Sequence, residues 1–157
     1  MQHANETHIV NSWLGDLAHQ IDTPLMLNEY NVCAIGHVSG IDCIIEAPAT
    51  HGLVLLRAAL LPWPRPDAQA AERFLELHFL GLKTGGASFA IDAEERELVL
   101  WMSRRLAALD SNSFSNMVAE FLEQAAWWKN ILLADGDPNA MSTRSTFPAA
   151  PGSAAQV

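Results

Sequence analysis

The sequence is poor in cysteine and in basic residues, and each shortage excludes a class of protein. Cys33 and Cys43 are the only cysteines among 157 residues, so a disulfide framework is not expected, and both are predicted to pack as small hydrophobic side chains on neighbouring strands. Lys and Arg number 9 against 18 Asp and Glu, which gives a net charge of -9. Nucleic acids and anionic membranes attract clustered basic residues, so neither is an expected partner. The acidity favours solubility or a basic partner.

Long apolar runs are also missing. The best candidate for a membrane span, Leu53–Leu61, is interrupted by Arg57 and ends at Pro62. Met1–Thr7 lacks the basic segment followed by an apolar segment that marks a signal peptide. The expectation is a cytoplasmic protein without membrane insertion.

Residue patterns for metal binding or catalysis are absent as well. The 6 histidines and 2 cysteines form no close metal-ligand pattern, so no metal or other cofactor is expected. Cys33 and His37 share a strand face, as a nucleophile and its base would. Four residues along a strand span about 13 Å, however, which is too far for a hydrogen bond. A non-catalytic protein is therefore predicted; a small α+β enzyme that uses Cys33 or His37 remains an alternative, as does a structural subunit of a larger assembly.

Hydrophobic periodicity predicts three helices and about five strands. In chain order the predicted elements are helix 6–20, strands 32–38, 41–47 and 53–60, helix 68–80, strands 87–91 and 97–103, and helix 111–133. Residues 25–27 are a candidate for a short edge strand. The order α-β-β-β-α-β-β-α with hairpin connections favours an α+β fold with an antiparallel sheet. Residues 1–136 are predicted to form a single domain, and residues 137–157, rich in Ala, Ser, Thr and Pro, a disordered tail.

The second predicted helix is apolar around more of its circumference than one contact explains. It is therefore expected to be buried twice, once on its own sheet and once on a second subunit. Because C2 symmetry is the commonest closed arrangement, this predicts a homodimer with Phe74, Leu77 and His78 at the interface.

Apolar side chains of the first helix and the first strands are the candidate anchors for a bound partner. They are Trp13, Leu14, Leu17, Leu25, Leu27 and Ile35. Part of this set must pack inside the subunit, so only some of it is expected to face the partner. Edge strands offer main-chain pairing in addition.

Several segments in a fixed order resemble a known family. They are Leu27–Cys33 (LNEYNVC), Leu53–Leu61 before a proline break, Phe74–Leu77, Thr84–Asp92 (TGGASFAID) followed by Leu98–Leu100, and a last helix with Phe114, Phe121 and Trp128. From about Trp13 to Leu133 the chain resembles the class I chaperones of bacterial type III secretion, of the Tir-chaperone type. The break at Leu61–Pro66 and the tail after Asn139 depart from that family.

The resemblance implies a fold, a function and partners. The subunit would be an α/β sandwich without enzymatic activity, paired as a homodimer through the region of the second helix. Its partner would be the N-terminal segment of a secreted effector, bound in an extended form around the dimer and thereby kept soluble and competent for secretion. The secretion ATPase is a further candidate partner.

Overall fold

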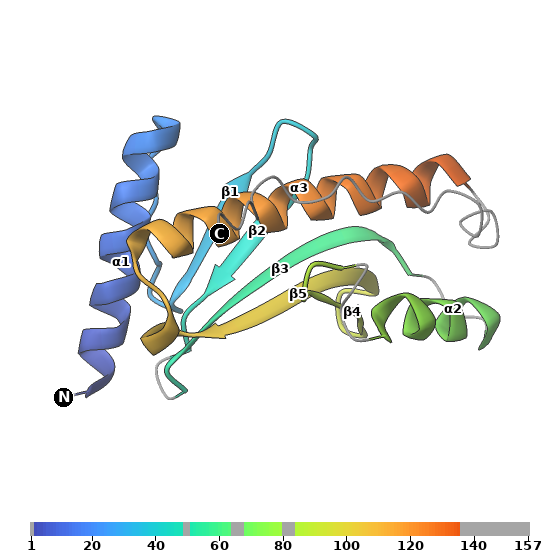
Figure 1. The fold of residues 1–157 in the computed structure, drawn as a ribbon, viewed down its shortest axis with the longest axis horizontal. Coiled ribbons are helices and arrows are strands. Elements are labelled where there is room, and N and C mark those ends of the chain that lie inside the picture. The colour runs from blue at the N-terminus through green and yellow to red at the C-terminus, as the bar shows by residue number, and fades with distance from the viewer. Residues whose placement is uncertain (1, 49–50, 64–67, 80–83, 136–157) are drawn as a thin grey trace, which may run out of the picture.

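The computed structural model describes residues 2–48, 51–63, 68–79 and 84–135, and it confirms the predicted order of elements. The elements are α1 (Gln2–Ile21), β1 (Val32–Gly36), β2 (Asp42–Glu46), β3 (Leu53–Pro62), α2 (Ala68–His78), β4 (Ser88–Asp92), β5 (Glu97–Arg105), the 3-10 turn η2 (Leu106–Ala108) and α3 (Ser111–Asp135). Figure 1 shows α3 running along the sheet, with α1 beside the beginning of α3 and α2 at the opposite end of the molecule.

The five strands form one antiparallel sheet in the order β1-β2-β3-β5-β4. The longest strand, β3, lies at its centre and pairs with β2 and β5. Side chains of β3 alternate between half-buried and buried along the strand, from half-buried Leu53 to buried Leu60. Since successive side chains of a strand point to opposite faces, this alternation shows that one face of the sheet carries the core and the other is only partly covered.

The helices α1 and α3 cover the core face together. The Trp13 ring of α1 lies 5.4 Å from the Phe114 ring of α3, measured between centroids. Asp110 caps α3: its Oδ1 accepts the Ser113 N–H at 2.7 Å, and its own N–H donates to the Ser113 hydroxyl at 3.1 Å. This reciprocal pair satisfies donors that the first turn of a helix leaves free, and Asp is a residue type favoured at that position.

A row of aromatic side chains joins α2 to the rest of the subunit. Phe74 of α2 lies between Trp63 and Phe89, with ring centroids 5.4 and 5.2 Å away. Phe89 continues the row to Trp128 of α3, at 4.9 Å. Aromatic pairs at these separations stabilise a fold beyond their buried area, so this row fixes which side of α2 faces inward.

The edge strand predicted for residues 25–27 is wrong. The main-chain N–H of Leu27 donates to the side-chain Oδ1 of Asn11 on α1, at 2.9 Å, and the segment forms no ladder with β1. The segment is thereby held against α1, and β1 is the edge strand on this side of the sheet. The tail predicted for residues 137–157 lies outside the described residues.

Candidate protein-binding surfaces

The six predicted partner anchors divide between the core and the surface. Four of them are buried in the subunit: Leu14, Leu17, Leu27 and Ile35. Trp13 and Leu25 are half-buried and pack against the core. A partner can therefore reach only these last two without opening the fold.

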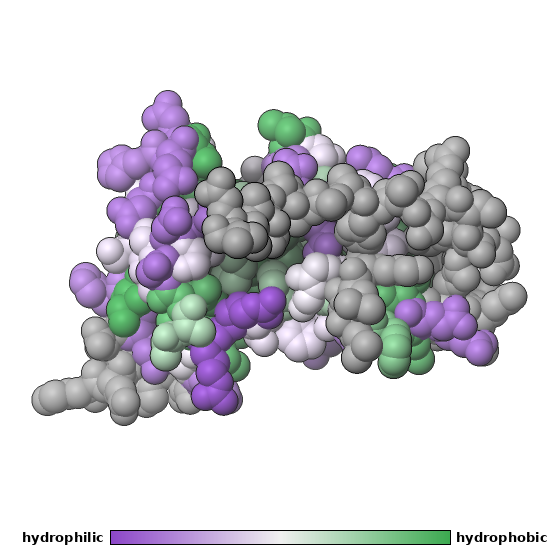
Figure 2. Space-filling model, viewed as in Figure 1, coloured by the Kyte–Doolittle hydropathy of each residue, from purple (hydrophilic) through white to green (hydrophobic). Residues whose placement is uncertain are grey.

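The predicted dimer residues divide in the same way along α2. Phe74 and Leu77 are buried inside the subunit, and His78 is half-buried, with a buried Nδ1 that has no hydrogen-bond partner among the described residues. The exposed apolar side chains are Leu75, 71% exposed, and Phe79, 69% exposed, immediately after α2. Figure 2 shows hydrophobic surface over this helix. We call Leu75 and Phe79, one helical turn apart, the α2 patch.

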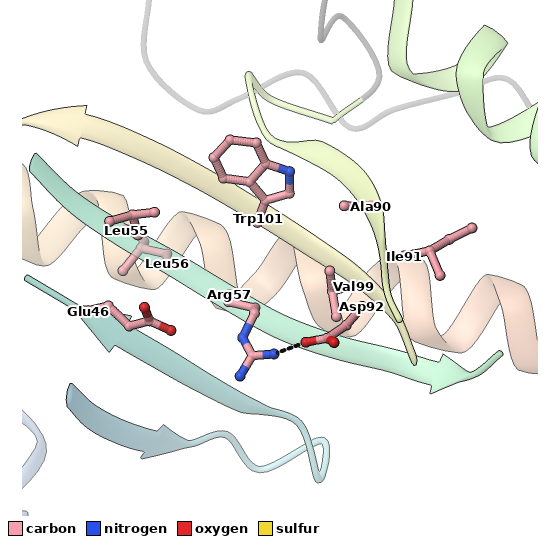
Figure 3. Close-up of a pocket in the computed structure, with 9 residues that line it drawn as sticks. All are labelled: Glu46, Leu55, Leu56, Arg57, Ala90, Ile91, Asp92, Val99 and Trp101. Atoms are coloured by element: carbon pink, nitrogen blue, oxygen red, sulfur yellow. Dashed lines mark hydrogen bonds and ion pairs between the residues drawn. The ribbon is translucent and has the colours of Figure 1, made fainter. Parts of the chain in front are cut away.

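The face of the sheet opposite the core, here called the open face, carries half-exposed apolar side chains. The register places odd-numbered residues of β3 as far as Ala59, odd-numbered residues of β5 and even-numbered residues of β2 and β4 on it. Figure 3 looks onto this face, with α3 behind the strands. Its apolar side chains include Ile44, Leu55, Ala59, Ala90, Val99 and Trp101.

An ion pair crosses the open face. Arg57 Nη1 of β3 donates to Asp92 Oδ2 of β4 at 2.6 Å, reaching past β5, which lies between the two strands. Val99 of β5, on the same face, is only 4% exposed. Asp92 Oδ1 also accepts the N–H groups of Glu94 and Glu95, at 3.0 and 3.1 Å. The carboxylate therefore holds both the turn after β4 and the arginine.

A depression of about 300 Å³ surrounds this ion pair. It is lined by Glu46, Leu55, Leu56, Arg57, Ala90, Ile91, Asp92, Val99 and Trp101 (Figure 3). Trp101 is 36% exposed, and the Nε atom of Arg57 is buried without a hydrogen-bond partner among the described residues. An apolar floor with a few charged groups suits a side chain of a bound molecule.

Strand β1 offers main-chain groups at the free edge of the sheet. The N–H of His37 donates to the carbonyl of Ile41 at 2.8 Å, which fixes the phase of the ladder with β2. Because hydrogen-bonded pairs alternate in an antiparallel ladder, even-numbered residues of β1 direct their main-chain groups outward. The carbonyl of Val32 accepts the Asn28 N–H at 2.9 Å, and the N–H of Val32 donates to the side-chain Oδ1 of Asn28 at 3.0 Å. The N–H and carbonyl of Ala34, in the middle of β1, point to the free edge.

The residues considered for nucleophilic catalysis are placed poorly for it. Burial raises the pKa of the Cys33 thiol and raises that of Cys43 to about 12, which disfavours the reactive thiolate. The His37 ring contacts the Ser39 hydroxyl at 2.8 Å and lies 3.6 Å from a Glu123 carboxylate oxygen. In the part of the chain that the structure describes, no group of three or more His, Cys, Asp or Glu side chains is placed to hold a metal ion.

The open face was not predicted from the sequence to be a binding surface, although one residue pointed to it. Arg57 interrupts an apolar strand at a position whose neighbours Leu56 and Ala58 are buried. A charged residue in such a strand must lie on a face that partners or water can reach. Its partner Asp92 is 35 positions away along the chain. Among the described residues, no helix is long and apolar enough to cross a membrane.

Comparison with known proteins gives one family. The model of the Tir chaperone protein (CesT) family matches residues 12–129. No curated protein sequence matches the chain at a significant level.

Solved structures share the fold at low sequence identity. A chain of the ExsC–ExsE complex is similar with a TM-score of 0.71 and 20% identity, over 80% of this chain and 95% of that one. A chain of the HopA1–SchA chaperone–effector complex has a TM-score of 0.66 and 16% identity, over 79% and 95%. YbjN from E. coli has a TM-score of 0.58 and 17% identity, over 80% and 89%. At these identities the likeness shows the fold.

Proposed function

Because the chain belongs to the Tir chaperone protein (CesT) family, we propose that it is a cytoplasmic type III secretion chaperone that binds one segment of a bacterial effector protein. The segment lies near the effector's N-terminus and is bound in an extended form. Binding keeps the effector soluble and competent for secretion. The observation that carries this proposal is a partly covered apolar sheet face, continuous with a free strand edge, on the fold of this family. The complexes ExsC–ExsE and HopA1–SchA, which contain similar chains, support it.

The apolar area that the bound segment must bury follows from the conformational entropy it loses on binding. Ordering one residue of a disordered chain costs about 1–2 kcal/mol. Apolar burial returns about 25 cal/mol per Å², so each ordered residue must bury about 40–80 Å² of apolar surface unless hydrogen bonds contribute. The depression in the open face is too small for a whole segment. Edge β1 adds main-chain hydrogen bonds, and the segment therefore extends over both surfaces.

Effector capture with purified chain tests the proposal. The tagged full-length protein should retain an effector from a lysate of its native host, identified by mass spectrometry. Calorimetry with the purified N-terminal segment of that effector should then give a negative heat-capacity change. Trp101→Ala should weaken binding at least about tenfold, or 1.4 kcal/mol, because exposed Trp side chains anchor interfaces. The matched control Leu133→Ala removes an exposed apolar side chain from the end of α3 and should bind normally.

A separate variant tests the main-chain hydrogen bonds that the free edge of β1 offers to the effector segment. Ala34→Pro removes an N–H that faces the free edge, and proline is tolerated at such positions of edge strands. Binding should fall while circular dichroism and the melting temperature stay close to those of the parent protein. Normal binding by both Ala34→Pro and Trp101→Ala would place the effector elsewhere and refute this account of the site.

We further propose a homodimer formed through the α2 patch. Two large exposed apolar side chains one turn apart favour burial against a second copy. The double variant Leu75→Asp/Phe79→Asp should be monomeric in light scattering, whereas Leu133→Asp should keep the parent mass. A parent protein that is monomeric at micromolar concentration would contradict the dimer.

The chaperone acts in this proposal by binding alone. Burial of Cys33 and Cys43 and the raised pKa values of their thiols support a packing role. An interaction with the secretion ATPase stays a prediction. Surface plasmon resonance between the purified ATPase and the chaperone–effector complex checks it.

A further inference from the structure

Glu46 is an unpaired carboxylate at one end of the depression in the open face. It lies on β2 in register with Leu55 and is half-buried. No hydrogen bond or ion pair joins its side chain to another described residue. The nearest cation in the lining, Arg57, is engaged by Asp92 instead. A cation from outside would find Glu46 free.

The charge of the open face favours a cation over an anion. The register places four carboxylates and two guanidinium groups on this face: Asp42, Glu46, Asp92, Glu97, Arg57 and Arg105. The chain as a whole carries a net charge of -9. A carboxylate of a partner would therefore approach against the surrounding potential, while a basic side chain would be attracted.

Apolar surface lies beside Glu46 in the same depression. Leu55 of β3 lies opposite Glu46. Trp101 of β5 lies opposite Arg57, two residues further along β3 (Figure 3). Lysine and arginine lay their aliphatic stems on such surface while the charged end reaches a polar group. The face of a Trp ring attracts cations within about 6 Å. Both features match one long basic side chain.

We propose that the depression binds a lysine or arginine side chain of the effector segment, with its stem on Leu55 and Trp101 and its charged end on Glu46. This inference rests on the proposed chaperone function and names the chemistry that the partner presents to the open face. The effector segment is thus expected to carry a basic residue next to apolar ones.

Selection from a random-peptide display library tests this specificity with purified full-length protein. Peptides retained by the parent protein should be enriched in Lys or Arg beside apolar residues. Glu46→Gln should lose the basic enrichment, whereas the matched control Glu97→Gln, on the same face but outside the depression, should keep it. A lysine-containing peptide selected on the parent should bind Glu46→Gln about fivefold more weakly at low salt, and high salt should reduce the difference.

The other outcomes separate the two proposals. Basic enrichment that persists in Glu46→Gln overturns the inference and leaves the chaperone function standing. Enrichment in Asp or Glu overturns it as well and makes Arg57 the anchor. Failure of the parent protein to select any peptide, together with failure to capture an effector, refutes both.

Discussion

The Arg57–Asp92 pair allows a sharp test of what holds the open face together. Three single variants separate the charge from the hydrogen bonds. Arg57→Met removes the cation but keeps a flexible, unbranched side chain at this position. Asp92→Asn removes the anion but keeps an acceptor for the N–H groups of Glu94 and Glu95, and Asp92→Ala removes both.

The structure sets the expected magnitudes. The side chains of Arg57 and Asp92 are 36% and 23% exposed, so water screens their attraction. An ion pair of this kind contributes about 0–1 kcal/mol, which is the expected loss for Arg57→Met and for Asp92→Asn. The two turn hydrogen bonds add about 1 kcal/mol each, so Asp92→Ala should cost about 2–3 kcal/mol in total. The buried Nε of Arg57 has no partner among the described residues, and its removal lowers the cost of Arg57→Met further.

Urea unfolding followed by Trp fluorescence measures these differences. All variants are compared at one protein concentration, since dimerisation makes the midpoint depend on concentration. The dependence of unfolding free energy on urea should stay constant while the midpoint moves. A double-mutant cycle with Arg57→Met and Asp92→Asn should give a coupling energy below about 1 kcal/mol. Equal losses for Asp92→Asn and Asp92→Ala would show that the ion pair dominates and that this reasoning is wrong.

Three further predictions concern the core and its turns. Gly85→Ala should destabilise the protein by about 1–2 kcal/mol, because the φ of Gly85 is 57° and a Cβ would lie 2.7 Å from Gln124 Nε2. The matched control Gly15→Ala lies inside α1 with nothing within 4 Å of the new Cβ, so it should stabilise the protein by about 0.5–1 kcal/mol. Thermal or urea unfolding measures both changes. The pKa of the buried Cys43 thiol is about 12, so the folded state keeps a proton that the unfolded chain releases above pH about 9. Stability should therefore fall by up to about 1.4 kcal/mol per pH unit between these values, and Cys43→Ala should flatten that slope in pH-dependent unfolding. Phe74→Asp should unfold the subunit by circular dichroism, at a cost of at least about 3 kcal/mol, whereas a folded monomer would place Phe74 at the dimer interface.

Much of the fold could be predicted because periodicity is a local property. The apolar run of β3, interrupted only by Arg57, indicates a strand, the helical spacing in α3 shows which side chains share a face, and Asp110 shows where α3 begins. The order of these elements then limits the chain to an antiparallel sheet with helices. These features depend on residues a few positions apart, and the structure confirms them.

What covers each face was decided only by the tertiary structure. The apolar positions of α2 were visible in the sequence, but contacts of Phe74 with Trp63 and Phe89 determine that it turns inward and leaves Leu75 exposed. The strand order, with β5 between β3 and β4, brings Arg57 to an aspartate 35 positions away and leaves Glu46 without a partner among the described residues. Local sequence specifies that a face is apolar; only packing of distant segments determines whether that face is filled from within the subunit or left for a partner.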